Sequence, residues 1–196
     1  MQRLPHARIG GRVCCAILTV VIAGATAFPV TARQEHTLVE YQVEAAFLYN
    51  FAKFIEWPGD TFQTEKSPIV ICVFGHDSMV TILDEVVRGK TIGGREVAVR
   101  RENETSNLRG CQMVFVDEQE NKRLPLILGS LAGSSVLVVG ESEDFAERGG
   151  TVQFYLDDNK LRFAINVDAV QRAHLNVSSR LLALARIVHD NGHPKG

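Results

Sequence analysis

Three short and almost uninterrupted apolar runs constrain the fold of this chain more than any other feature. They are PIVICVF at residues 68–74, CQMVFV at 111–116 and SVLVV at 135–139. A strand that is apolar at successive positions is typical of a sheet with both faces covered, as in parallel sheets connected by helices. The segments between the runs, residues 78–88 and 118–131, have the residue spacing of helices. The sequence therefore predicts an α/β fold.

Further strands extend this sheet. Residues 96–101 alternate between apolar and polar side chains, which predicts a strand with one wet face. Residues 151–156 and 160–166 flank the turn sequence Asp157-Asp158-Asn159, which predicts a β-hairpin.

Helices are expected on both sides of these strands. Apolar residues at three- and four-residue spacing predict a helix over residues 37–57 and another over 178–189, and Gly140-Glu-Ser142 is expected to open a short helix. Pro125 is expected to kink or interrupt the helix over residues 118–131. The complete prediction is an α/β fold with a mixed β-sheet of about five to six strands flanked by helices, with a C-terminal β-hairpin and helix.

The first 32 residues have the pattern of a secretory signal peptide. They contain three arginines and no acidic residue, an apolar run at residues 13–23, and small residues up to Ala27 and Ala32. Cleavage after Ala27 or Ala32 would release the mature chain into the periplasm. The alternative is an uncleaved anchor, but the apolar run is shorter than the roughly 20 residues that span a bilayer. We therefore expect one exported domain over residues 38–190.

Charge and cysteine content narrow the function further. The chain has 21 Lys and Arg against 23 Asp and Glu, and removal of the three basic residues in the signal peptide leaves 18 against 23, a net charge of −5. This balance argues against nucleic acid as a partner. Only Cys72 and Cys111 lie outside the signal peptide, so an oxidising compartment predicts that they pair. The alternative is two buried free thiols.

The helix over residues 37–57 carries four aromatic residues that could contact another protein. They are Phe47, Phe51, Phe54 and Trp57. A broad apolar stripe of this kind packs against a domain core or offers an interaction surface. Both alternatives stay open from the sequence.

Catalytic signatures are absent from the sequence. It contains no G-x-S-x-G, G-x-x-x-x-G-K-[ST], H-E-x-x-H or C-x-x-C motif. His189 and His193 lie in a Gly- and Pro-containing tail that is a poor setting for a metal site. We predict a protein that is not an enzyme and that has no catalytic residues, no cofactor and no bound metal.

Polar residues at the ends of the predicted strands support a second hypothesis. His76 and Asp77, Asp117, and Glu141 each follow a buried strand. In open α/β sheets ligands bind beyond the carboxyl ends of parallel strands, although such residues also serve as ordinary turns and helix caps. The alternative function is thus a periplasmic small-molecule-binding protein or hydrolase that uses this crevice.

Several polar and basic residues near the C-terminus form a candidate anion site. If the hairpin folds back on the last helix, they would converge on an anion or an acidic partner. Alternatively, they are solvated side chains and a helix cap. The residues are Arg148, Arg162, Asn166, Ser178, Ser179 and Arg180.

Six motifs, taken together, resemble the YfiR family from about residue 38 to residue 189. They are EYQVEAAFLYNFAKFIEWP at 40–58, GKTIGGR at 89–95, LRGC at 108–111, FAERGG at 145–150, RFAIN at 162–166 and VSSRLL at 177–182.

The resemblance implies a periplasmic repressor that forms a homodimer and binds the periplasmic domain of an inner-membrane diguanylate cyclase. Binding would lower cyclic-di-GMP and biofilm formation. The resemblance also leaves a histidine kinase as an alternative membrane partner, since members of the YfiR family would bind either kind of protein. The resemblance also implies sequestration by an outer-membrane lipoprotein, and redox control through a disulfide at the positions of Cys72 and Cys111.

Overall fold

The computed structural model of the protein describes residues 38–75 and 77–191. The predicted signal peptide, His76 and His193 lie outside these residues. The α-helices of these residues are α1 (Leu38–Phe54), α2 (Asp77–Val87), α3 (Leu124–Ser130), α4 (Val167–Arg172) and α5 (Ser179–Leu182). Short 3₁₀ segments are η1 (Gly59–Thr61), η2 (Thr105–Gly110) and η3 (Glu118–Arg123). The strands are β1 (Ile55–Glu56), β2 (Ile69–Phe74), β3 (Thr91–Ile92), β4 (Arg95–Glu102), β5 (Met113–Val116), β6 (Leu137–Gly140), β7 (Val152–Asp157), β8 (Lys160–Asn166), β9 (Asn176–Val177) and β10 (Arg186–Val188).

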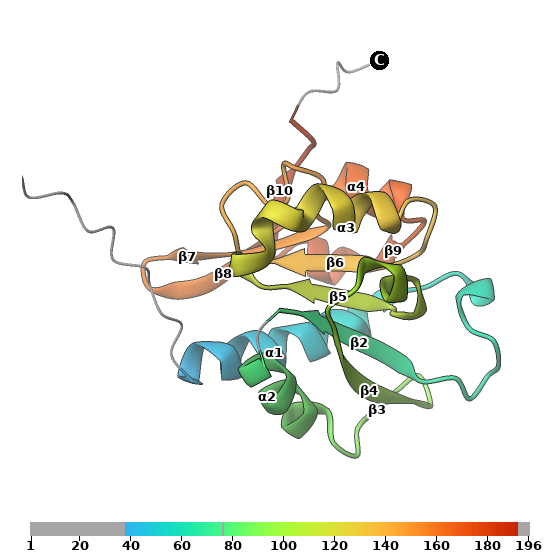
Figure 1. Ribbon diagram of the computed structural model, residues 1–196. Helices are drawn as coiled ribbons and strands as arrows, with labels where there is room; N and C mark the ends of the chain where they lie inside the picture. The colour runs from blue at the N-terminus through green and yellow to red at the C-terminus, as the bar shows by residue number, and fades with distance from the viewer. Residues whose placement is uncertain (1–37, 76, 192–196) are drawn as a thin grey trace, which may run out of the picture. The chain divides into compact units, whose positions relative to one another are not determined.

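Eight of the strands form one mixed sheet (Figure 1) in the order β10-β8-β7-β6-β5-β2-β4-β3. The strands β4, β2, β5, β6 and β7 are parallel to their neighbours in that series, and β10 is parallel to β8. The pairs β7–β8 and β3–β4 are antiparallel. The predicted fold class is confirmed. The sheet has more strands than the five to six that were predicted, because the sequence contains no clear signal for the short edge strands β3 and β10.

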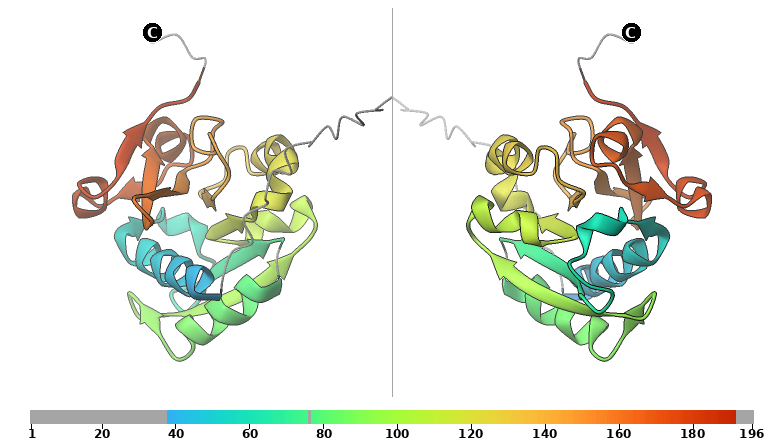
Figure 2. Two further views of the ribbon diagram at one scale, coloured as in Figure 1. Left: turned by 90° about the vertical axis from the view of Figure 1, so that its left-hand side faces the viewer. Right: turned by 90° about the vertical axis from the view of Figure 1, so that its right-hand side faces the viewer.

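Both faces of the central strands are buried, which explains their continuous apolar sequence. In β2, Ile71 and Val73 face a core beneath α1 and α2, while Cys72 and Phe74 face a second core beneath η2 and α3. Figure 2 shows α1 and α2 together on one side of the sheet and α3 on the other. Alternate side chains of one strand thus serve two cores.

The β7–β8 hairpin closes through a tight turn, as predicted. Asp158 and Asn159 have φ of 49° and 56°. Positive φ at both central residues is the geometry of a type I′ turn, which Asp and Asn adopt more readily than other side chains.

Two predicted helices were wrong in part. The helix expected over residues 178–189 ends at Leu182, and Arg186–Val188 instead forms the edge strand β10, paired with Ala164, Ile165 and Asn166. Pairing with the free edge of β8 overrides the helical propensity of this Leu- and Ala-rich segment. The short helix expected at Gly140 is a series of turns.

The helix predicted over residues 118–131 is interrupted next to Pro125, as one of the two expected outcomes. The segment Glu118–Arg123 is 3₁₀, and Pro125 lies in the first turn of α3, where its missing N–H is not needed. The helix α4 was not predicted. Asn166 starts it, because the Asn166 side chain accepts hydrogen bonds from the backbone N–H groups of Asp168 and Ala169.

Candidate functional site

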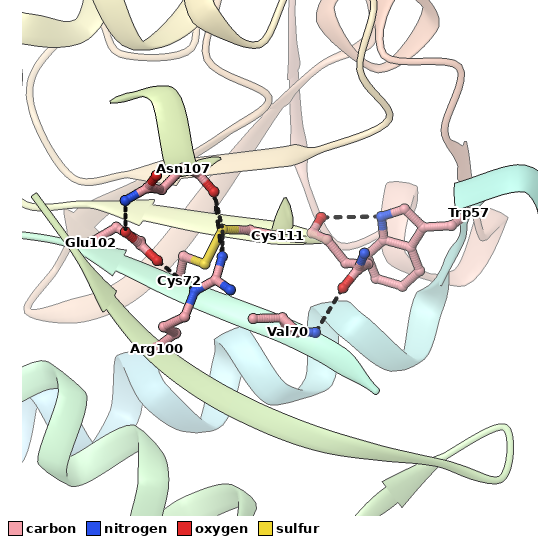
Figure 3. The surroundings of a disulfide bond; sticks show 8 residues. Trp57, Val70, Cys72, Arg100, Glu102, Asn107 and Cys111 are labelled. Atoms are coloured by element: carbon pink, nitrogen blue, oxygen red, sulfur yellow. Dashed lines mark hydrogen bonds and ion pairs between the residues drawn. A yellow bond between two sulfur atoms is a disulfide. The ribbon is translucent and has the colours of Figure 1, made fainter. Parts of the chain in front are cut away.

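Cys72 and Cys111 form a disulfide that joins β2 to the residue directly after η2, two positions before β5 begins (Figure 3). Both cysteines are buried in the core between the sheet, η2 and α3. The bridge closes a loop of 39 residues. It therefore adds a covalent link between β2 and the start of the segment that forms the neighbouring strand β5.

A polar cluster covers the disulfide from the β4 side (Figure 3). The guanidinium of Arg100 lies 3.5 Å from Cys111 Sγ and pairs with the Glu102 carboxylate at 2.5 Å. Asn107 donates to the same carboxylate at 3.0 Å, and the Asn107 carbonyl accepts from Arg100. This cluster holds the 3₁₀ segment η2 over the bridge.

The predicted aromatic contact residues divide between core and half-buried positions. Phe51 is 1% exposed, and its ring stacks on Phe154 at 5.6 Å and meets Phe163 edge-on at 5.0 Å. Phe51 is therefore a core residue. Phe47 and Phe54 are half-buried, and Phe47 also packs against the rings of Phe154 and Phe163.

Trp57 is half-buried, and its side chain is hydrogen-bonded to the backbone next to the disulfide (Figure 3). Its indole N–H donates to the backbone carbonyl of Gln112 at 3.1 Å, and the Gln112 side chain accepts from the backbone N–H of Val70 at 2.8 Å. Trp57 therefore connects the segment after β1 to Gln112, which precedes β5, and Gln112 in turn is hydrogen-bonded to β2.

Exposed aliphatic residues continue the aromatic cluster outward to solvent. Val43 lies one helical turn before Phe47, and Leu156 lies two residues after Phe154 on the same face of β7. Val39, Val43 and Leu156 are 67%, 41% and 49% exposed. We call these three residues the α1–hairpin patch. In Figure 1 the first turns of α1 and the turn of the β7–β8 hairpin both lie toward the left of the view.

A crevice lies at the carboxyl ends of the parallel strands and includes two of the residues that were predicted there, Asp77 and Asp117. A cavity of about 300 Å³ is lined by Gly75, Asp77, Arg101, Asn103, Asp117, Gln119 and Glu120. Asp77 pairs with Arg101 at 2.7 Å, and the buried Asp117 accepts from the backbone N–H of Gln119 at 2.8 Å. Glu141 does not line the cavity, and its carboxylate accepts from the backbone N–H of Glu118.

Tyr41 brings a further group from α1 to the acidic side chains at these strand ends. Burial raises the pKa of Tyr41 to about 12, and the negative charges of Asp117, Glu141, Glu44 and Glu40 act in the same direction. The hydroxyl therefore stays protonated at neutral pH. Binding of a small molecule or hydrolysis in this crevice remains a prediction.

The residues of the predicted anion site have separate contacts in the structure. Asn166 is fully buried and starts α4, whereas Ser178 caps α5 by accepting from the backbone N–H of Arg180. Arg162 lies near Asp157 on the hairpin, at 3.8 Å. Arg148 contacts Asn121 instead. Ser179 is exposed in the first turn of α5. Binding of an anion or an acidic partner by these six residues stays a prediction.

A larger cavity of about 550 Å³ lies between α3 and α4 and was not predicted. We call it the α3–α4 pocket. Arg148 is the only predicted anion-binding residue in the lining of this pocket. Two further charged residues, Arg172 and Asp190, also line it. No sequence signal could have found it, because its lining comes from four separate segments of the chain. Among residues 38–75 and 77–191, no three His, Cys, Asp or Glu side chains gather in a way that would hold a metal ion.

Three side chains fasten the segment after β10 to α4. Arg172 forms a bidentate ion pair with Asp190, and Asn166 donates to Asp190 Oδ1 at 2.6 Å. His189 Nδ1 lies 3.1 Å from both carboxylate oxygens of Asp168. The bond to His189, and then that to the Asp190 backbone N–H, hold the pKa of Asp168 below its usual range. Burial raises the pKa of Asp190, but bonds from Arg172 and Asn166 outweigh burial and leave that pKa lowered.

These lowered pKa values predict acid sensitivity of the C-terminal attachment. A carboxylate whose pKa is depressed by folding stabilises the fold above its unfolded pKa, and this stability is lost as the pH falls through the folded pKa. The free energy of unfolding should therefore fall below a pH of about 4, the unfolded range for Asp. Asp190→Asn should reduce the steepness of that fall in denaturant titrations at several pH values. An unchanged profile, or the same change in the control variant Asp60→Asn at an exposed position of η1, would contradict this assignment.

No helix within the described part of the chain is long and apolar enough to cross a membrane.

No curated protein matches the sequence. Solved structures are similar to the chain at low sequence identity. One is a conserved domain protein from Vibrio cholerae O1 biovar El Tor, with 10% identity, a TM-score of 0.50, and coverage of 75% of this chain and 59% of that one. Another is the ABC domain in complex with L-Trp from Streptococcus pneumoniae, with 10% identity, a TM-score of 0.48, and coverage of 76% and 62%. The chain thus spans about three fifths of each.

The family comparison covers most of the described fold. Residues 41–186 match the profile of the YfiR/HmsC-like family. This range begins in α1, includes the disulfide and the whole hairpin, and ends at the first residue of β10. The match extends over well more than half of the chain, and this protein therefore belongs to the YfiR/HmsC-like family.

Proposed function

We propose that this protein is a periplasmic regulator that binds and represses a membrane-bound signalling protein, and that this partner is a diguanylate cyclase. Membership of the YfiR/HmsC-like family is the observation that carries the proposal. The disulfide supports export, because such bonds persist in oxidising compartments. The proposal includes cleavage of the signal peptide in residues 1–32, one domain over 38–190, and a homodimer.

The protein acts in this proposal by binding rather than by catalysis. If the repressor binds the inactive conformation of the cyclase more tightly than the active one, binding shifts the cyclase population toward the inactive conformation. The cyclase then makes less cyclic-di-GMP. An outer-membrane lipoprotein that competes for the repressor would relieve the inhibition. A histidine kinase is the alternative membrane partner.

The α1–hairpin patch is the surface that we assign to partner contact. Val39, Val43 and Leu156 expose aliphatic surface beside the half-buried Phe47, and the aromatic cluster beneath them is rigidly packed. Interfaces obtain most of their affinity from a few apolar anchors on a fixed support. Phe54 is the last residue of α1, and Trp57, which was predicted to belong to the same helix, directly follows the short strand β1.

Co-purification from the native host tests this proposal. The tagged protein, recovered from detergent-solubilised membranes, should carry with it an inner-membrane protein that has a cyclase or kinase domain. Val39→Asp combined with Val43→Asp should reduce this recovery by about tenfold or more, because two charges are placed in an apolar contact. Leu126→Asp is the matched control, since Leu126 is as exposed as Val39 but lies on α3, across the sheet. Equal recovery with all three proteins would contradict the assigned surface.

A further inference from the structure

The α3–α4 pocket combines an apolar floor with a charged rim. Its floor is formed by Leu128, Leu131, Val136, Val138, Ala169 and Ala173, and its rim includes Glu147, Arg148, Arg172 and Asp190. A cavity of about 550 Å³ lies within the size range of sites for small organic ligands. A lining that is mostly apolar with a few polar groups is also typical of such sites.

Gly149 keeps this space open. Its φ is +104°, a conformation that favours glycine, and a Cβ at this position would lie 3.2 Å from Leu128 Cδ1 and 3.7 Å from Arg172 Nη2. A side chain there would therefore enter the gap between α3 and α4. The backbone of Gly149 instead forms part of the pocket wall.

The charges on the rim leave one cation without an acidic partner. Arg172 is paired with Asp190 through two contacts, and Glu147 lies 4.0 Å from Arg186. Arg148 donates to the side-chain and backbone oxygens of Asn121, which are both neutral. No carboxylate within the described residues forms an ion pair with Arg148. Arg148 is therefore the cation of this rim that is available to pair with the negative charge of a ligand.

We propose that the α3–α4 pocket binds a small monocarboxylic acid with an apolar body. The carboxylate pairs with the Arg148 guanidinium, whose planar donors match carboxylate geometry, and the body covers the Leu128, Val136 and Ala173 surface. The pocket is distinct from the α1–hairpin patch, because it lies beside α3 across the sheet from α1. The proposal does not depend on the identity of the membrane partner.

Three probes that differ in head group and body size test this proposal on the disulfide-bonded protein. Amide chemical shifts are followed by NMR during titration with 4-phenylbutyrate, 4-phenylbutan-1-ol and acetate. We expect 4-phenylbutyrate to bind with a Kd of about 1 mM or tighter and to shift the amides of Gly149, Ala173 and Asn191. The alcohol should bind at least about fivefold more weakly, since it lacks the charge. Acetate, which lacks the body, should cause no saturable shift.

Two arginine variants separate the pocket from general electrostatics. Arg148→Gln should weaken 4-phenylbutyrate binding by about tenfold, to the level of the alcohol. Arg162→Gln removes the same charge from the hairpin and should leave binding unchanged. Arg148 is exposed, so both variants should keep the parent melting temperature. The proposal is overturned by an absence of saturable shifts at about 10 mM 4-phenylbutyrate, by equal affinity in Arg148→Gln, or by shifts confined to other surfaces.

Discussion

Replacing Cys72 and Cys111 together by alanine is expected to lower the free energy of unfolding by about 4 kcal/mol. The disulfide closes a 39-residue loop and so restricts the unfolded chain, which is the main source of this stabilisation in the chain-entropy account. Both sulfurs are buried, so the smaller side chains also leave space in the core around Phe74 and Val114. Urea titration under oxidising conditions measures the loss.

Reduction provides the control for this prediction. Dithiothreitol should lower the stability of the parent protein to nearly that of the double variant and should leave the variant unchanged. A variant as stable as the parent would show that the bridge contributes little. If the reduced protein also loses its membrane partner while still folded, the disulfide controls binding as well as stability.

Gly150→Ala is expected to destabilise the fold by about 3 kcal/mol or more. A Cβ at Gly150 would lie 2.1 Å from Phe145 Cε1 and 2.9 Å from the Phe145 backbone oxygen. Phe145 is 1% exposed, so its ring has no free space in which to move. A Cβ at Gly140 would meet the same ring at 2.3 Å, which means that two glycines form the slot for one aromatic side chain. Thermal and urea unfolding measure the effect.

Two further variants identify the steric cause. Gly59→Ala has nothing within 4 Å of its Cβ and should change stability by no more than about 0.5 kcal/mol. Phe145→Leu removes the clashing ring atoms, so Gly150→Ala should cost at least about 1 kcal/mol less in that background. A purely additive double variant would rule out the clash as the cause.

The sheet could be predicted because its central strands are buried on both faces. Continuous apolar runs of strand length, as at β2, β5 and β6, are typical of such strands, and the Asp-Asp-Asn turn located the hairpin. The edge strand β10 could not be predicted in the same way. It has only three residues and directly follows a Leu- and Ala-rich run with helical propensity, so its pairing with the β8 edge had no separate signal in the sequence.

The candidate sites were predictable only where they were local in the sequence. The cysteine pair follows from composition and compartment, and the strand-end position of Asp77 and Asp117 follows from topology. The α3–α4 pocket is built from segments distant in sequence, and whether Phe51 faces the core or solvent depends on the hairpin that covers it. Apolar periodicity alone does not distinguish these two environments.

Cyclic-di-GMP in the native host tests the central claim most directly. Its concentration should be measured in the parent strain, in a strain lacking this gene, and in the deletion strain complemented with the complete chain or with a chain lacking residues 1–32. The account predicts a rise on deletion that the complete chain reverses and the chain without its export signal does not. An unchanged concentration on deletion, or full reversal by the chain retained inside the cell, would contradict a periplasmic repressor of a cyclase.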